Sequence, residues 1–203
     1  MKENSMKQER SIETRNKLLK AGTTVFLYNG FTQTTMTQII KEAGVGYGTA
    51  YVYFKNKDDL LRVIMDDTIV SLQAIGLMPF VPSTKPEAID IITKQLCLVI
   101  DAALQHQRML KVVYEAIGCS PLIADFWKKF QDTFKLSIAR DIRYVQEIGL
   151  AHPHINADVL AHLWYSLNEQ VMWDFVLHKN NANHEMDEVV ELMVHLYTNS
   201  LYK

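Results

Sequence analysis

The chain has 203 residues, of which 48% are hydrophobic and 22% charged, and its formal net charge is −2. This composition is typical of a folded globular protein, and the length suffices for one full core or two modest ones. No apolar run of about 18 residues is present, which excludes a membrane-spanning helix. The start of the sequence is polar and mixed in charge, so we do not expect a secretion signal.

The two cysteines, Cys97 and Cys119, lie far apart, and each has apolar neighbours at helical spacing. This pattern favours two buried thiols in a reducing cytoplasm over a disulfide or a pair of metal ligands. We therefore expect a cytoplasmic protein in which neither cysteine binds a metal.

The charge is unevenly distributed along the chain. Residues 1–60 carry nine lysines and arginines against six aspartates and glutamates, whereas the remaining residues carry twelve against seventeen. A basic N-terminal segment followed by an acidic remainder is typical of a nucleic-acid-binding module joined to a second module. Such splits also arise by chance, so the asymmetry is only a first indication.

Apolar residues at helical spacing, polar caps and glycine breaks predict four helices in the first part of the chain. Gly30 is a natural left-handed cap for the first helix, and Thr35 is a suitable N-cap for the second. Two short helices joined by a glycine-bearing turn, behind a supporting helix, form a helix-turn-helix arrangement. The predicted helices span residues 11–29, 36–43, 47–53 and 58–75, the last without a break. The predicted core is Leu18, Val25, Phe26, Phe31, Ile39, Ile40, Val45, Tyr51 and Phe54.

The segment from Gly44 to Lys57 combines three glycines, four aromatic residues and two lysines. A glycine costs about 1 kcal/mol relative to alanine inside a helix, so packing alone does not explain this composition. Glycines permit a tight turn and a close approach to another surface. Because hydroxyl and ammonium groups suit phosphate oxygens, the segment predicts a DNA-binding helix.

The remainder of the chain is predicted to be helical after a loop from Pro79 to Pro86. No alternating strand pattern, repeat or low-complexity tract is present. The predicted helices span residues 87–106, 107–117, 121–148, 157–179 and 185–202. The sequence therefore predicts an all-α protein of about nine helices.

Residues in fixed register across the first three helices resemble the DNA-binding domain of bacterial TetR-family transcriptional regulators. The resemblance covers roughly the first 60 residues, and the remainder is similar to the family only in length and helical texture. The residues that carry it are Thr14, Arg15, Asn16, Lys17, Leu18, Leu19, Lys20, Ala21, Phe26, Gly30, Phe31, Thr34, Thr35, Ile39, Ala43, Gly44, Val45, Gly48, Thr49, Tyr51, Tyr53, Phe54, Lys57, Leu60 and Leu61.

The resemblance implies a homodimer whose DNA-binding domain, residues 1–57, binds a roughly palindromic double-stranded operator. It also implies a helical domain over residues 58–203 that dimerises and binds a small effector, which releases the DNA. The expected function is therefore that of a ligand-responsive repressor with no cofactor and no membrane contact. The residues that the resemblance places at the DNA are Thr35, Thr37, Gly46, Tyr47, Gly48, Thr49, Tyr51, Tyr53, Lys55 and Lys57.

The recognition helix departs from the family pattern at its start. Gly46 stands where many members have a serine that caps this helix, so we expect a weaker cap here. Tyr51 and Tyr53 are two residues apart and cannot share one face of a helix. We expect Tyr51 to be half-buried and Tyr53 to be the better phosphate donor, and Lys57 to meet the DNA backbone rather than water alone.

Aromatic residues, methionines and a few polar residues of the C-terminal part predict a ligand pocket, because pockets combine apolar walls with few polar groups. For each residue alone, the alternative is an ordinary helical core. An apolar or cationic aromatic ligand would suit these side chains. The predicted lining is Met65, Tyr114, Glu115, Trp127, Phe130, Phe134, Trp164, Tyr165, Asn168, Glu169 and Met172.

The last two predicted helices carry apolar residues around too much of their circumference for burial against one neighbour. A four-helix bundle across a two-fold axis would cover the second side, so the residues predict a dimer independently of the resemblance. The predicted interface residues are Leu163, Leu167, Val171, Phe175, Val190, Met193, Val194 and Tyr197.

The sequence carries no catalytic signature, since no Ser-His-Asp or Cys-His order and no phosphate-binding glycine loop is recognisable. His152 and His154 have no cysteine or carboxylate at ligand spacing, which favours a solvated loop over a metal site. The alternative function is a helical ligand carrier or enzyme whose N-terminus resembles a helix-turn-helix by coincidence. Salt-dependent DNA binding distinguishes the two.

Overall fold

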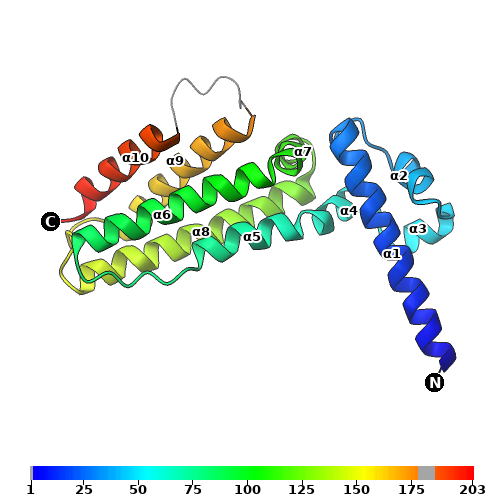
Figure 1. The fold of residues 1–203 in the computed structure, drawn as a ribbon, viewed down its shortest axis with the longest axis horizontal. Helices are drawn as coiled ribbons and strands as arrows, with labels where there is room; N and C mark the ends of the chain where they lie inside the picture. The colour runs from blue at the N-terminus through cyan, green and yellow to red at the C-terminus, as the bar shows by residue number, and fades with distance from the viewer. Residues whose placement is uncertain (1, 178–185) are drawn as a thin grey trace. The chain divides into compact units, whose positions relative to one another are not determined.

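The structure is a computed structural model that describes residues 2–177 and 186–203, without the side chains of residues 2–7. The described part contains ten helices and, besides them, a single isolated antiparallel bridge between Ala151 and Tyr202 (Figure 1). The all-α prediction is therefore confirmed. The gap between the helices predicted at 157–179 and 185–202 lies outside the described residues.

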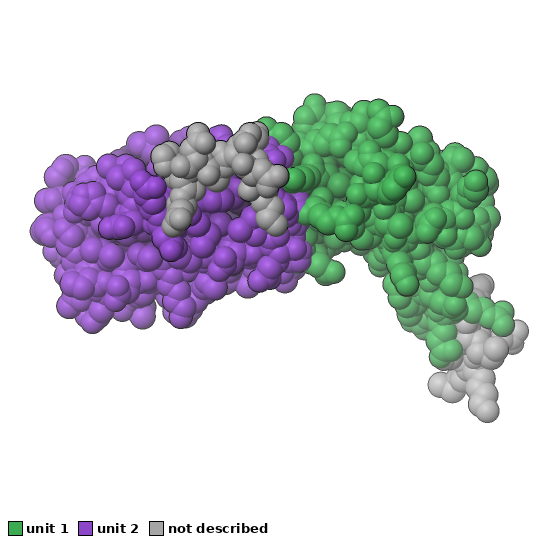
Figure 2. Space-filling model, turned by 45° about the horizontal axis from the view of Figure 1, so that its top comes forward, with its two compact units in different colours: residues 1–68, 108–127 green, residues 69–107, 128–203 purple. Residues whose placement is uncertain are grey.

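The chain folds into two compact units (Figure 2). The N-terminal unit comprises residues 1–68 and 108–127, and the C-terminal unit comprises residues 69–107 and 128–203. The predicted domain boundary after residue 57 thus falls inside the N-terminal unit. Residues 108–127, which no sequence pattern assigned to the DNA-binding part, pack with it.

The helices of the N-terminal unit follow the predicted helix-turn-helix order. The first helix begins earlier than predicted, because residues 2–10 are mostly helix-compatible glutamate, lysine, glutamine and methionine. The predicted fourth helix divides at the fully buried Met65, whose N–H bonds the carbonyls of both Leu61 and Val63. The helices are α1 (Lys2–Asn29), α2 (Met36–Ala43), α3 (Tyr47–Tyr53), α4 (Lys57–Ile64), the start of α5 (Asp66–Gly76), nearly all of α7 (Gln107–Ile117) and the start of α8 (Pro121–Glu147).

Two glycines and a threonine set the ends of the short helices. Gly30 and Gly44 adopt positive φ values of 75° and 63°, which favour glycine, and Gly44 caps α2. Thr35 forms a capping box with Gln38 at the start of α2, as its N-cap prediction requires. The turn and the cap together fix how α2 leaves α1.

Most of the predicted core of the N-terminal unit is buried, and the Phe26 and Phe31 rings stack with centres 6.0 Å apart. Two core predictions need correction. Val45 is only half-buried, and Tyr51 is 50% exposed. Ala50 is fully buried instead, since it faces inward on a helix that leaves its larger neighbours outside.

The C-terminal unit is a bundle in which α6 contacts both α9 and α10. Its helices, beyond the remainders of α5 and α8, are α6 (Lys85–Gln105), α9 (Ala157–Leu177) and α10 (Met186–Leu201). Cys97 is half-buried in this unit, and burial raises the pKa of its thiol. Cys119, in the N-terminal unit, is exposed, which corrects the prediction of two buried thiols, because the turn after α7 leaves it at the surface.

Candidate DNA-binding surface and effector cavity

The recognition helix α3 presents a face that the protein itself does not cover. Tyr47 and Tyr51 are 55% and 50% exposed, and Val52 is 79% exposed. Apart from its chain neighbours and the backbone of its own helix, no atom of the described chain lies within 4 Å of the position that a Cβ of Gly48 would occupy. These residues recur at intervals of about one helical turn, so α3 can approach another surface closely along this face.

The structure corrects the expected burial of the two later tyrosines of α3. Tyr51 is exposed, whereas Tyr53 is half-buried and its hydroxyl shares a hydrogen bond of 3.0 Å with Ser11 Oγ. Tyr51 therefore offers the freer hydroxyl, and the phenol of Tyr53 joins α3 to α1. The side-chain period of a helix placed the two on different faces, but it did not say which face was covered.

The remaining predicted DNA residues of α2 and α3 lie at the surface. Thr35, Thr37, Thr49 and Lys55 are exposed, and Gly46 begins α3 without any side-chain cap, as expected. Sequence reasoning missed Val52, although its position four residues after Gly48 puts both on one helical face. An exposed apolar side chain on such a face suits the methyl group of thymine.

The ammonium group of Lys57 is hydrogen-bonded within the N-terminal unit. Its ammonium donates to the carbonyl oxygens of Phe31 at 2.8 Å, Thr32 at 3.3 Å and Thr34 at 2.8 Å. It also lies 4.4 Å from the centre of the Phe31 ring. Because an ammonium has three donors, contact with a phosphate would require it to give up one of these bonds. Lys57 thus fastens the turn between α1 and α2 to the start of α4.

Glu115, predicted to bind ligand, holds the same turn from the other side. Its two carboxylate oxygens accept the backbone N–H groups of Phe31 and Thr32, each at 2.8 Å. Burial opposes ionisation, but the hydrogen bonds from Thr32 and Phe31, with the charge of Lys57, outweigh it and lower the pKa of this carboxyl. A Cβ at Gly30 would lie 2.6 Å from the Glu115 carboxylate, so only glycine fits there without displacing it.

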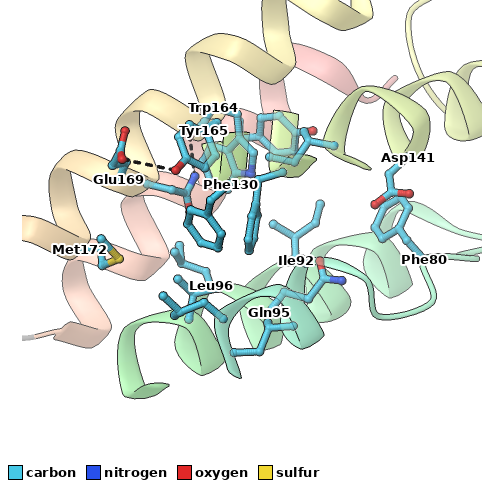
Figure 3. Close-up of a pocket in the computed structure, with 18 residues that line it drawn as sticks. Phe80, Ile92, Gln95, Leu96, Phe130, Asp141, Trp164, Tyr165, Glu169 and Met172 are labelled. Carbon is cyan, nitrogen blue, oxygen red and sulfur yellow. Dashed lines mark hydrogen bonds between the residues drawn. The ribbon is translucent and has the colours of Figure 1, made fainter. Parts of the chain in front are cut away.

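The C-terminal unit contains a cavity of about 100 Å³ between α5, α6, α8, α9 and α10 (Figure 3). Seven predicted ligand residues line it: Phe130, Phe134, Trp164, Tyr165, Asn168, Glu169 and Met172. Its walls are mainly apolar and aromatic, and the Trp164 ring stacks on Tyr197 with centres 4.2 Å apart. Phe80, Gln95 and Asp141 line it as well, although no sequence pattern marked them.

The charged groups of the cavity lining are both carboxylates, and they lie at opposite ends of the cavity in Figure 3. At one end, both carboxylate oxygens of Glu169 accept hydrogen bonds from Gln131 Nε2, each at 2.9 Å. One of them also accepts a hydrogen bond from the Tyr165 hydroxyl at 3.3 Å. At the other end, burial raises the pKa of Asp141, and the adjacent Arg140 opposes that rise. Burial also raises the pKa of Tyr165. The site thus combines aromatic walls with negative charge.

Four predicted ligand residues do not line this cavity. Met65 and Trp127 are buried in the core of the N-terminal unit, and Glu115 binds the turn described above. Tyr114, on the same unit, is 48% exposed. Their prediction is corrected because α7 and the first turns of α8 pack with the DNA-binding helices, which composition alone did not reveal.

The residues predicted for the dimer interface differ in how far their own chain covers them. Val190, Met193, Val194 and Tyr197 are buried by their own chain, which corrects their prediction as interface residues. Val171 and Phe175 are half-buried, whereas Leu163 and Leu167 are 60% and 41% exposed. The exposed apolar face of the last two helices, here called the α9–α10 face, consists of Val159, Leu163, Leu167, Leu192 and Leu196.

Within the described residues, no group of three or more His, Cys, Asp or Glu side chains is placed to hold a metal ion. The His152 and His154 rings lie 5.3 Å apart. None of the described helices is both long and apolar enough to cross a membrane.

Two parts of the chain match known families. Residues 18–64 match the model described as bacterial regulatory proteins of the tetR family. Residues 92–203, more than half of the chain, match the C-terminal domain of the transcriptional regulator EthR. The two matches fall on the helix-turn-helix and on most of the helices that surround the cavity.

Individual relatives agree with this result. The chain is 28% identical to the transcriptional regulator UidR of Escherichia coli K12 over 163 residues, which are 79% of this chain and 81% of UidR. It is 24% identical to EthR of Mycolicibacterium smegmatis over 172 residues, 85% of this chain and 78% of EthR. The crystal structure of NalD, the secondary repressor of the MexAB-OprM multidrug efflux pump in Pseudomonas aeruginosa, shares the fold with a TM-score of 0.72 at 16% identity, covering 96% of this chain and 98% of NalD.

The exposed face of α3, the cavity and these matches point to one class of protein. Regulators of this family bind operator DNA and small effectors as dimers and are in general not enzymes, so the alternative of an incidental helix-turn-helix is not favoured. The chain belongs to the TetR family and is a ligand-responsive, DNA-binding transcriptional regulator.

Proposed function

We propose that the protein is a repressor that leaves its operator when an aromatic cation enters the cavity of the C-terminal unit. The observation that carries the proposal is the pairing, in one chain, of an uncovered recognition helix with a cavity whose charged lining is acidic. NalD, which shares the fold, is described as a repressor. Because operator DNA lies in the bacterial cytoplasm, we propose that the protein acts there.

The exposed face of α3 would enter the major groove. Tyr47, Gly48 and Thr49 would reach base edges at the start of the helix, and Val52 would contact a thymine methyl group further along. Thr35 and Thr37 at the start of α2 would bind phosphates, and Lys55 would approach the backbone after the end of α3. Lys57 would act indirectly by holding the turn before α2.

The α9–α10 face would form the dimer. Five exposed leucine and valine side chains on two neighbouring helices are more than a solvated surface requires, and a two-fold copy would cover them as a four-helix bundle. The two recognition helices of a DNA-bound dimer would then lie about 34–36 Å apart, one turn of DNA. An effector that altered the direction of α4 would change this spacing.

The cavity favours an effector with a flat apolar body and a positive charge. Aromatic rings of Phe130, Trp164 and Tyr165 would stack on or edge against such a body, and they attract cations through their faces. The carboxylate of Glu169 or Asp141 would bind the charge, and among the described residues no lysine or arginine is part of the lining. A neutral molecule of the same shape would lose the charge-assisted bond.

The proposal is tested with two fluorescent probes, cationic thioflavin T and neutral N-phenyl-1-naphthylamine. Glu169→Gln keeps the size of the side chain but removes its charge, and we expect it to weaken binding of the cation about tenfold while leaving the neutral probe unchanged. Glu191→Gln, on the exposed surface of α10, is the matched control. Equal affinity of both probes for wild type and Glu169→Gln would rule out cation recognition by this residue.

DNA release is tested separately. The purified protein is used to select genomic fragments, and its affinity for them is measured by fluorescence anisotropy with and without bound probe. A repressor released by its effector shows lower affinity when the cavity is occupied. A regulator that binds more tightly in the presence of ligand would be a co-repressed or activating type, and the proposal would be wrong.

A further inference from the structure

The first helix, and not only the helix-turn-helix, lies beside the end of the recognition helix. Ser11 Oγ and the Tyr53 hydroxyl are 3.0 Å apart, and the guanidinium of Arg15 lies 5.6 Å from the centre of the Phe54 ring. Ser11 and Arg15 are one turn apart and share a face of α1. In Figure 1 the N-terminal half of α1 continues past α3. Two residues of α1 thus flank the last residues of the DNA-binding helix.

Arg15 is held in place but keeps its hydrogen-bond donors. Its side chain is exposed, and the ring contact with Phe54 is its sole interaction among the described residues. The neighbouring Lys17, in contrast, is paired with Glu13 at 2.9 Å. The ammonium group of Lys57 already donates hydrogen bonds to three backbone carbonyl groups. Arg15 is therefore an oriented cation with a free planar set of N–H groups, which suits a phosphate.

The hydroxyl pair beside Arg15 has spare donor capacity. Ser11 and Tyr53 each carry one O–H, and the bond between them uses only one of the two. The second O–H remains available to a phosphate oxygen. The pair also fixes the distance between α1 and the end of α3, so the group as a whole is preorganised.

The dimensions of the groove place a phosphate near this group. The seven residues of α3 span about 10 Å, whereas the major groove is about 12 Å wide. When the start of such a helix contacts base edges, its last residues lie close to the sugar–phosphate wall. Tyr53 and Phe54 occupy that end, and Ser11 and Arg15 lie against them.

We propose that Arg15, assisted by the hydroxyl pair of Ser11 and Tyr53, binds a DNA phosphate and extends the DNA-binding surface onto α1. The proposal rests on the placement of α3 in the major groove given above. Its contact is independent of sequence, because phosphates are the same at every base pair. Arg15, rather than Lys57, then supplies the charge that makes binding sensitive to salt at this edge.

The experiment measures the salt dependence of binding to a random-sequence duplex by fluorescence anisotropy. Each phosphate contact contributes about 0.9 to the slope of log affinity against log salt, so Arg15→Gln lowers the slope of a dimer by about 1.8. Arg15→Lys retains the charge and is expected to keep the wild-type slope. Ser11→Ala removes an uncharged donor, so affinity falls but the slope stays. Lys20→Gln, an exposed cation further along α1, is the control and leaves both unchanged.

A purely structural role of Arg15 gives a different result. If Arg15→Gln lowers the thermal midpoint of unfolding but keeps the wild-type slope, Arg15 only packs on Phe54 and the inference is overturned. If the wild-type protein itself binds DNA without any salt dependence, the failure lies with the DNA-binding geometry proposed above. Equal slopes for wild type and Arg15→Lys, with a slope about 1.8 lower for Arg15→Gln, support the inference.

Discussion

The two units of the protein use their charged side chains in opposite ways. In the N-terminal unit, Lys57 and Glu115 bind backbone groups of one turn, so their charges are matched by carbonyl oxygens and N–H groups. In the C-terminal unit, Glu169 and Asp141 lie at the lining of an apolar cavity. Charges bound to the backbone fix the shape of a turn, whereas the carboxylates of Glu169 and Asp141 bind neighbouring side chains at the lining of a cavity. The DNA-binding unit therefore uses charge to hold a turn, and the C-terminal unit places charge beside a cavity.

The largest expected effect concerns the α9–α10 face, through which two copies of the chain would form the DNA-binding dimer. Leu163→Glu places a charge in the middle of the α9–α10 face, and burial of an unpaired charge prevents dimerisation. A monomer has only one recognition helix, so its operator affinity falls by about 10²- to 10⁴-fold. Light scattering gives the oligomeric state, and anisotropy gives the affinity. Val70→Glu, at another exposed apolar position of the same unit, serves as control; a dimeric Leu163→Glu protein would show that the interface lies elsewhere.

The turn between α1 and α2, which Lys57 and Glu115 hold, can be disrupted at Gly30. Alanine there takes a left-handed φ at a cost of about 1–2 kcal/mol, and its Cβ displaces the Glu115 carboxylate from two charge-assisted bonds worth about 1.5–3 kcal/mol each. We expect unfolding by denaturant to show a loss of stability of about 4 kcal/mol, the low end of the sum of these costs. Gly48→Ala is the matched control: it has open space and leaves stability unchanged or up to about 1 kcal/mol higher. Equal stability of the two variants would contradict the role assigned to the turn.

A smaller effect follows from the ionisation of Glu115. Its pKa is lower in the folded protein than the ordinary value of 4.5, so its contribution to stability is fully present above pH 4.5 and is lost as the pH falls through the folded value. Glu115→Gln removes this contribution, and the variant is expected to be less stable than wild type by about 1–3 kcal/mol at neutral pH. The difference narrows in acid. Denaturation curves at several pH values test this, and a constant difference would show that ionisation of Glu115 does not stabilise the turn.

The helix-turn-helix was accessible from the sequence because its signals are local. Gly30, Thr35 and Gly44 act within a few residues of their own positions, and the structure places each where its chemistry predicts. The expectations for Tyr53 and Lys57 did not include contacts that each makes with distant parts of the chain. Tyr53 is covered because Ser11, 42 residues away, binds it, and Lys57 is occupied by carbonyls more than 20 residues upstream.

The helices of the C-terminal unit could be predicted from the sequence, but the side of each helix that is buried could not. Apolar residues surround α9 and α10, and periodicity cannot say which side a neighbouring helix covers. Val190 and Leu192 are both apolar, yet the first is buried by its own chain and the second is 58% exposed. Glu115 was misassigned for a related reason: aromatic neighbours in the sequence suggested a pocket, whereas α7 packs with the DNA-binding helices. Composition identified seven lining residues of the cavity because aromatic side chains cluster there.

In the proposed function, occupation of the cavity in one unit controls DNA binding by the other. The most direct test measures the affinity of the protein for its own selected genomic fragments as thioflavin T is titrated to saturation of the cavity, in wild type and in Glu169→Gln. The account predicts that DNA affinity of the wild type falls as the probe binds, and that the variant needs about tenfold more probe for the same fall. Unchanged DNA affinity with the cavity saturated would contradict it.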